Sequence, residues 1–205
     1  MPKPASRHET TARNRERLLD AAGKVISKSG LVGASLQEIA AAAGLTKGAV
    51  YSQFDSKEDL LIALLDRRFE IGHAQLREVL SGDTPMGEQV AELDNWHRGE
   101  RGSGRLWAIL ELELSLAAAR QPRLRRKLRL RQRRSRELLA ELITRIADEN
   151  NLKLPVEAID FAVVLSALSD GLLVHWLNDN KAVPHDLFAR FLISTVLAAN
   201  EQGGS

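Results

Sequence analysis

The residues of this chain with the clearest chemical potential lie between Thr46 and Lys57, in the segment TKGAVYSQFDSK. Their hydroxyl, amide and ammonium groups donate hydrogen bonds to phosphate oxygens and to base edges, and Gly48 leaves the backbone open to close approach. The segment therefore has the chemistry to contact a nucleic-acid duplex. Together with a serine further upstream, the candidate contact residues are Ser35, Thr46, Lys47, Gly48, Ala49, Tyr51, Ser52, Gln53 and Lys57.

Two short helices must position these groups. Ser35 and Glu38 form a capping box, which starts a helix at the next residue after the serine. Gly44 supplies the permissive backbone that a helix end needs. Thr46 then caps a second helix, which we expect to run to roughly Phe54. The sequence thus predicts two helices joined by a glycine turn.

The two helices carry small or apolar residues where they would cross. A solvated hairpin whose alanines merely pack needs no such register, so the pattern favours DNA binding over that alternative. A second capping box, from Ser56 to Asp59, starts a third helix and places Lys57 in its first turn, where phosphate oxygens are favoured. The inward residues are Ile39, Ala40, Ala43, Leu45 and Val50.

The segment GASLQEIAAAAGLTKGAVYSQFDSKEDLL resembles the DNA-binding segment of the TetR family of bacterial transcriptional regulators. The resemblance is strong over residues 11–65. The rest of the chain fits the family in length, helical pattern and local echoes such as Asp170-Gly171-Leu172. The resemblance implies an all-helical homodimer that binds a palindromic double-stranded DNA operator and releases it when a small-molecule effector enters the C-terminal domain.

The resemblance also implies roles for individual residues. Lys47, Gly48 and Ala49 match positions that read bases in the family. Four other residues match mostly phosphate-contacting positions, namely Thr46, Tyr51, Gln53 and Lys57.

Composition agrees with a helical protein of two domains. The 205 residues are 44% hydrophobic, which is enough for a sizeable core, and the absence of cysteine excludes disulfides and thiolate metal sites. The polar start has no apolar central region, and we see no run long enough to cross a bilayer. We therefore expect a cytoplasmic protein with no membrane contact, no metal and no cofactor.

We expect three regions along the chain. Residues 1–10 form a disordered arm, in which Lys3 and Arg7 either reach a minor groove or stay frayed. Residues 11–55 form a three-helix helix-turn-helix DNA-binding domain whose first helix, 11–29, ends before Gly30. Residues 56–205 form a larger helical domain for effector binding and dimerisation. Within it we expect a helix to about residue 80, breaks at 82–85 and 99–105, and a weaker helical pattern at 88–96.

Candidate effector contacts begin in the helix at 106–119, which is apolar almost all round. Glu113 falls near the middle of its apolar arc and Glu111 at the edge. A buried carboxylate needs a partner, so Glu113 either meets an arginine such as Arg131 or faces a ligand cavity. Polar residues also interrupt the apolar stripes of the next two helices. The candidate ligand residues are Trp107, Leu110, Glu111, Glu113, Leu114, Arg131, Ser135, Ser166 and Asp170.

The helix opened by Pro155 is apolar on nearly every face as far as Leu177, and a last helix starting at Pro184 has a second apolar face. Together they predict a four-helix bundle across a two-fold axis. His175 and Trp176 are interpreted as core or interface residues rather than ligand contacts. The predicted interface residues are Gly171, Val174, Phe188, Phe191, Leu192 and Thr195.

Residues 120–136 carry ten Lys or Arg and no acid, although the net charge of the whole chain is only +2. This run is either a second phosphate-binding patch, for DNA flanks or a phosphorylated ligand such as an acyl-CoA, or a solvated helix face. The position of the run, well past the DNA-contacting segment in the chain, favours the solvated face.

These observations predict a ligand-responsive transcriptional repressor. The effector would wedge between helices 106–119 and 122–150, shift the helix that begins at Ser56, and change the spacing of two reading heads about 34 Å apart. The alternatives are a constitutive architectural DNA binder and a helical enzyme or carrier with a DNA-targeting domain. The chain offers no catalytic residue set to support an enzyme, because its five histidines are scattered. The effector, the operator, the regulated genes and the choice between repression and activation stay open.

Overall fold

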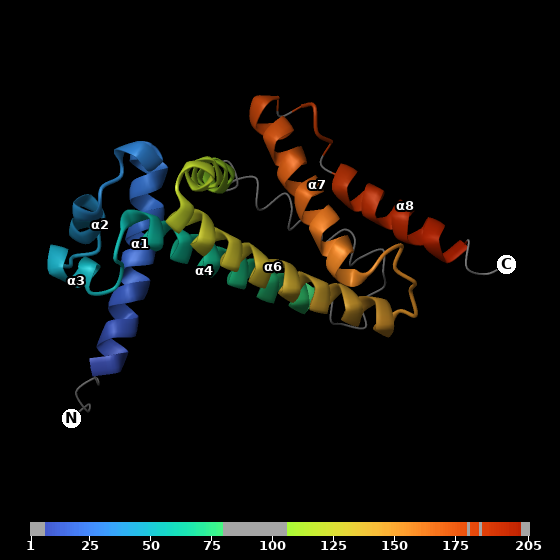
Figure 1. Ribbon diagram of the computed structural model, residues 1–205, viewed down its shortest axis with the longest axis horizontal. Coiled ribbons are helices and arrows are strands. Elements are labelled where there is room, and N and C mark those ends of the chain that lie inside the picture. Colours follow the sequence, from blue (N-terminus) through green and yellow to red (C-terminus); the bar gives the residue numbers. More distant parts are fainter. Residues whose placement is uncertain (1–6, 80–105, 180, 185, 202–205) are drawn as a thin grey trace. The chain divides into compact units, whose positions relative to one another are not determined.

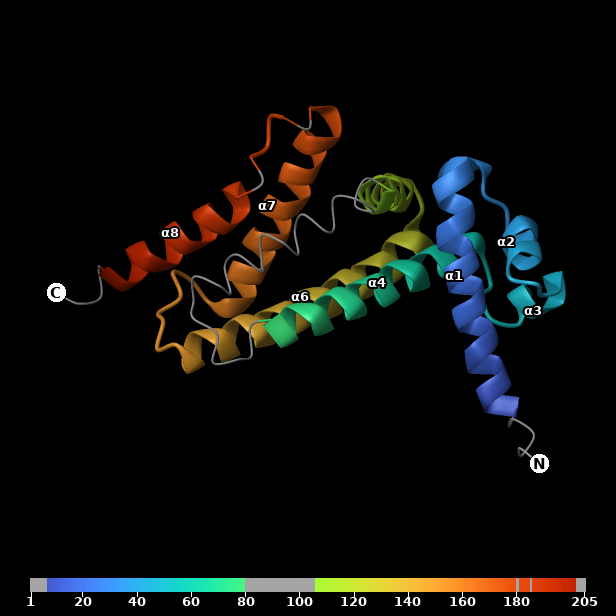
Figure 2. The same ribbon diagram turned by 180° about the vertical axis from the view of Figure 1, so that it is seen from behind.

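A computed structural model describes residues 7–79, 106–179, 181–184 and 186–201, and all regular secondary structure within these ranges is α-helical. This confirms the predicted all-α fold. The chain divides into two compact units, Met1–Arg68 and Phe69–Ser205. The ribbon in Figure 1 and the reverse view in Figure 2 show the helices of each unit.

The N-terminal unit contains α1 (Arg7–Gly33), α2 (Leu36–Ala42), α3 (Lys47–Tyr51) and the first half of α4 (Lys57–Val79). Helix α1 begins four residues before the expected position, so the expectation of a disordered arm is wrong for residues 7–10. Glu9 lies in the first turn of α1, where a negative charge stabilises the N-terminal end of a helix. Residues 1–6, including Lys3, lie outside the described part.

Gly30 interrupts α1 near its end. Its φ of 69° and ψ of 173° are non-helical, and one more turn follows before Gly33. The break lies where the sequence predicted the helix to stop, because glycine tolerates positive φ. Beneath α1, a single core joins the four helices of this unit, built from Leu18, Ala22, Ile26, Ile39, Val50, Leu60 and Leu64.

The C-terminal unit contains the second half of α4, a helix over residues 106–120, α6 (Pro122–Glu149), α7 (Ala158–Asn178) and α8 (Leu187–Glu201). Helices α7 and α8 run side by side in both views (Figures 1 and 2). Ile143 of α6 and Phe161 of α7 lie in the core that joins these helices, with Phe188, Leu192 and Val196 of α8 packed against it. Residues 80–105 lie outside the described part, and with them the expected breaks and the pattern at 88–96.

Helices α7 and α8 each begin three residues after the proline predicted to open them. Residues 151–157, which precede α7, are not helical. Asn200 accepts from the amide of Lys153 at 2.8 Å and donates to its carbonyl at 3.1 Å, which ties this segment to the end of α8. Glu157, the residue that precedes α7, has an extended ψ of 141°.

One described helix, α7, is long and apolar enough to span a membrane by length and composition alone. The expectation that no stretch reaches this length is therefore wrong. Only 17% of its most apolar window is buried within this chain. Several large apolar side chains of α7 and α8 are accordingly exposed, among them Val163 at 43%, Val164 at 52% and Phe191 at 50%.

Candidate functional site

The predicted capping box at the start of α2 is present. The Glu38 amide donates to Ser35 Oγ at 3.1 Å, and the Ser35 amide donates to Glu38 Oε2 at 2.9 Å. The backbone hydrogen bond from Ser35 is the main cause that lowers the pKa of the Glu38 carboxyl, and the charge of nearby Lys57 lowers it slightly further. The box fixes where α2 begins and satisfies amides that the helix leaves open.

The turn between α2 and α3 depends on Gly44, whose φ is 63°. Its amide donates to the carbonyl of Ala41 at 3.0 Å, and the amide of Leu45 donates to that of Ala40 at 2.9 Å. From α1, Arg17 Nη2 donates to the carbonyl of Ala43 at 2.6 Å. These bonds satisfy the last carbonyls of α2 and hold the turn against α1. Leu45 is half-buried rather than fully buried.

Helix α3 starts as predicted but ends early. Thr46 Oγ1 accepts from the amide of Ala49 at 3.2 Å, which is the expected N-cap. The helix stops at Tyr51 instead of reaching Phe54. Phe54 is instead drawn into the core at 3% exposure, and the guanidinium of Arg15 lies 4.7 Å from its ring centroid. The amide of Phe54 still donates to the carbonyl of Val50 at 2.9 Å, so the backbone keeps one helical hydrogen bond beyond the end of α3.

The candidate contact residues gather on the outer surface of α3. Lys47, Gly48, Tyr51 and Ser52 are exposed, whereas Ala49 and Gln53 are half-buried. Lys47 Nζ lies 5.7 Å from the Tyr51 ring centroid, so a cation and an aromatic ring share this surface. The inward residues Ile39 and Val50 are fully buried. The structure therefore separates the inner and outer faces as predicted.

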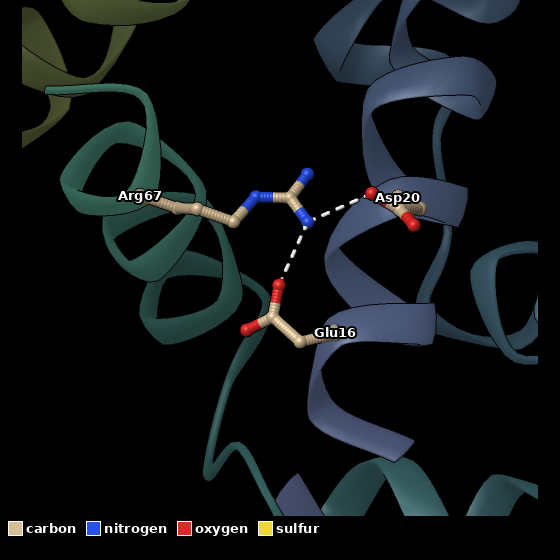
Figure 3. Close-up of polar contacts among 3 residues, drawn as sticks. All are labelled: Glu16, Asp20 and Arg67. Atoms are coloured by element: carbon tan, nitrogen blue, oxygen red, sulfur yellow. Dashed lines mark hydrogen bonds and ion pairs between the residues drawn. The ribbon is translucent and has the colours of Figure 1, made fainter. Parts of the chain in front are cut away.

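An ion-pair brace connects α4 to α1 behind this surface, and Figure 3 shows it. Arg67 Nη1 lies 2.8 Å from Asp20 Oδ1 and 3.1 Å from Glu16 Oε2. Arg67 was not predicted from the sequence, because the charge pattern of one helix does not show which residues of another helix its side chains contact. Arg15 and Arg17 were not predicted for the same reason.

A second polar cluster lies in the C-terminal unit, where residues 106–120, α6 and α7 contribute to it. Arg131 Nη1 lies 2.7 Å from Glu111 Oε1, and the arginine side chain is only 8% exposed. Burial, together with the negative charge of Glu111, raises the pKa of Asp170 to about 6, and the positive charge of Arg131 opposes this rise. The Asp170 residue keeps solvent-exposed surface even though protein crowds its carboxyl.

Glu113 was predicted either to meet an arginine such as Arg131 or to face a ligand cavity. The described ion pair of Arg131 is with Glu111. Residues two apart on a helix point about 200° apart, so both carboxylates cannot face the same guanidinium. Glu113 Oε2 is buried and has no hydrogen-bond partner in the described part of the chain.

The remaining predicted ligand residues lie on the same helices. Leu110 and Leu114 are buried, while Trp107 and Ser135 are half-buried. Ser166 donates to the carbonyl of Ala162 in its own helix at 2.8 Å. A shallow depression of about 680 Å³ lies elsewhere, between α6 and the start of α7, where Glu137 and Ile159 line it.

Comparison with known proteins covers both units. Residues 18–64 match the family model "Bacterial regulatory proteins, tetR family", and residues 100–198 match "BetI-type transcriptional repressor, C-terminal". The transcriptional repressor KstR of Mycolicibacterium smegmatis is 36% identical over 78 residues, which are 38% of this chain and 38% of the relative. The chain thus matches well under half the length of that relative.

Solved structures share the fold across nearly the whole chain. A TetR-family regulator from Rhodococcus sp. has a TM-score of 0.72 at 21% identity, over 92% of this chain and 98% of that one. A regulator from Saccharomonospora viridis in complex with choline has 0.64 at 22%, over 89% and 95%. FadR from Bacillus subtilis in complex with stearoyl-CoA has 0.65 at 20%, over 90% and 98%.

Proposed function

The chain belongs to the TetR family of bacterial DNA-binding transcriptional regulators, and we propose that it is a cytoplasmic repressor that binds a palindromic operator as a homodimer and releases it on binding a small molecule. The observation that carries the proposal is the exposed outer surface of α3, positioned by the Ser35 cap, the Gly44 turn and the Arg67 brace. One helix of five residues reads few bases, so two copies must bind half-sites about one turn, or roughly 34 Å, apart.

In this proposal, the residues that contact bases are Lys47, Gly48 and Ala49 at the start of α3. A Cβ at Gly48 would come no closer than 3.8 Å to any neighbour within the chain, so the bare backbone is not required by internal packing. It is suited to the close approach of DNA instead. Tyr51 and Gln53, together with Thr46 and Lys57, contact phosphates in this proposal.

The test compares two lysines. Selection from random duplexes first identifies the sequence that the wild-type protein prefers. Lys47→Ala should then lower operator affinity by about 1–3 kcal/mol and relax base preference, whereas Lys57→Ala should weaken all duplexes alike and reduce the salt slope by about one. Lys181→Ala, an exposed lysine of the C-terminal unit, serves as the control and should change neither. A Lys57→Ala protein with an altered base preference would show the two roles to be reversed.

The dimer uses the exposed apolar surface of α7 and α8. Of the predicted interface residues, Gly171, Val174 and Phe191 are exposed and Thr195 is half-buried. The other two, Phe188 and Leu192, pack against the core of their own chain and support the interface from beneath. Burying this surface in a second copy would remove the apolar area that one chain leaves in water.

Sedimentation velocity tests the dimer. Phe191→Glu should convert it to monomer, because a carboxylate would be desolvated at the centre of an apolar interface. Leu130→Glu is the matched control, since Leu130 on α6 is equally apolar and 62% exposed. A monomeric wild-type protein, or equal effects of both substitutions, would contradict this interface.

The effector binds beside the polar cluster, and we expect it to be cationic. Two carboxyl groups, those of Glu111 and Asp170, accompany one guanidinium that already binds Glu111. A ligand with a positive nitrogen would neutralise the excess negative charge. The neighbours in complex with choline and stearoyl-CoA share only the fold, so effector chemistry must be argued from these side chains.

A gel-shift titration with a panel of organic cations and acyl-CoA thioesters tests this assignment. A cation should release the operator, and Asp170→Asn should weaken that release at least tenfold while leaving operator affinity in its absence unchanged. Release by an acyl-CoA alone would refute the cationic class. A protein that responds to no compound would be a constitutive DNA binder, and turnover of any compound would indicate an enzyme.

Helix α4 begins in the DNA-binding unit and continues into the C-terminal unit, so it is the element that transmits the signal. An effector can shift α4 only by binding one state better than the other, and operator DNA must then weaken effector binding by the same factor. Calorimetry with and without saturating operator measures this factor. Unchanged effector affinity would exclude the switch.

A further inference from the structure

The N-terminal half of α6 has an unusual charge. Of the ten cations in residues 120–136, nine are arginines and one is lysine, and no acid lies among them. Since the whole chain carries a net charge of +2, all other residues together carry −8. The net positive charge of this protein therefore comes from one short segment.

Leucines and arginines of this segment lie on different faces of α6. Leu124 and Leu128 are buried on the inner face. Arg123, Arg125, Arg126 and Arg129 are exposed, and none of them pairs with an acid in the described ranges of the chain. We call these four arginines the basic surface of α6.

From Arg133 onward, α6 shows the arrangement of an ordinary solvated helix. Arg133 pairs with Glu137 at 2.7 Å, and Arg145 pairs with Glu149 at 3.9 Å, both at a spacing of four residues. In the basic surface, Arg125 and Arg129 have that same spacing but like charges, which repel and weaken the helix. A surface that served only solubility would mix both signs.

The residue type indicates what the basic surface binds. Arginine presents a planar fork that bonds phosphate through two parallel N–H donors, whereas lysine acts as a point charge. Residues four apart on α6 rise about 6 Å, and duplex DNA carries one charge per roughly 1.7 Å of axis. Successive arginines can therefore each meet a backbone phosphate.

We propose that the basic surface of α6 is a second DNA-binding site, which contacts the phosphate backbone independently of sequence. It takes DNA rather than a membrane, because the one large apolar side chain exposed beside it in the described part of α6 is Leu130, whereas a membrane-binding helix needs a whole apolar face. The same polyanion that α3 reads is the complementary partner. This site holds the protein on DNA of any sequence.

The test is the salt dependence of binding to a random duplex, measured by fluorescence anisotropy with the full chain between 50 and 200 mM salt. In the test variant, Arg123, Arg125, Arg126 and Arg129 become glutamine. Each lost phosphate contact lowers the slope of log K against log salt by about 0.9, so the slope should fall by roughly 3 to 4. Affinity at 100 mM salt should fall at least tenfold.

The control variant makes the same change of net charge at four arginines that pair with acids, namely Arg133, Arg134, Arg145 and Arg190. Its slope should stay within about one of the wild-type value. Equal slopes for wild type and test variant, or equal losses in both variants, would overturn the proposal. Circular dichroism checks that both variants keep the helical content of the wild type.

Two further measurements separate this site from the proposed reading surface. Lys47→Ala should lose operator preference while its random-duplex slope changes by no more than about one. If Lys47→Ala behaves so and the test variant keeps the wild-type slope, the basic surface fails and the proposed function stands. Sedimentation with phosphatidylserine vesicles tests the other polyanion. Vesicle binding that the test variant abolishes, with its DNA slope unchanged, would assign the surface to a membrane and overturn the proposal.

Discussion

Replacing Gly44 by alanine should destabilise the turn that sets α3 against α2. Gly44 has a φ of 63°, and alanine in the left-handed region costs about 1–2 kcal/mol. The added Cβ would also lie 3.1 Å from Arg17 Nη2, which donates to the Ala43 carbonyl at 2.6 Å. Displacing that guanidinium forfeits a hydrogen bond worth roughly 1 kcal/mol. The expected total is about 2–3 kcal/mol.

Gly30→Ala is a test of backbone strain alone, because nothing lies within 4 Å of its added Cβ. The φ of 69° with a ψ of 173° at Gly30 lies in a region essentially restricted to glycine, so this substitution should cost about 1–3 kcal/mol. The bond from Arg17 is measured by a double-mutant cycle instead. In an Arg17→Ala background the cost of Gly44→Ala should fall to the strain alone, since the displaced group is gone.

Native-state hydrogen exchange measures these energies locally. The amide of Leu45 donates to the Ala40 carbonyl at 2.9 Å, so its protection reports on the stability of the turn. Operator affinity should fall in parallel for Gly44→Ala, because α3 loses its fixed position. A Gly44→Ala cost that Arg17→Ala leaves unchanged would refute the reasoning.

Three further predictions follow from the described contacts. Gly48→Ala should leave the free energy of unfolding unchanged or raise it by up to about 1 kcal/mol, because alanine favours helix over glycine. The same substitution should weaken operator binding. Chemical denaturation measures the stability, and fluorescence anisotropy measures the binding. Ser35→Ala should cost about 1 kcal/mol at α2, seen in amide exchange. Because the pKa of Asp170 rises to about 6, its ionisation opposes folding, so stability should decline from about pH 4 to pH 6 and level off above. Asp170→Asn should remove this decline, and the affinity of a cationic effector should rise with pH through about 6 in the wild type only.

The N-terminal reading surface could be predicted from sequence because its determinants are local. The Ser35 cap, the Thr46 cap and the Gly44 turn each form within six residues of the chain. Backbone geometry and side-chain reach fix such motifs before any tertiary contact forms. The burial of Val50 and the exposure of Tyr51 then follow from the helical period.

Long side chains set the limits of prediction. Arg17 reaches a carbonyl 26 residues away, and Arg67 reaches carboxylates 47 and 51 residues away. Periodicity tells which face of a helix a residue occupies, but not which helix packs against that face.

Glu113 shows why a helical angle alone does not define a ligand site. The angle placed Glu113 in the apolar arc, where it would either meet an arginine such as Arg131 or face a ligand cavity. In the structure Arg131 meets Glu111, and Glu113 Oε2 is buried without a hydrogen bond in the described part of the chain. The proposed cationic effector is therefore argued from Asp170, because a positive charge would favour the ionised form of this carboxyl, whose pKa is raised to about 6. The Asp170→Asn titration tests that sign directly.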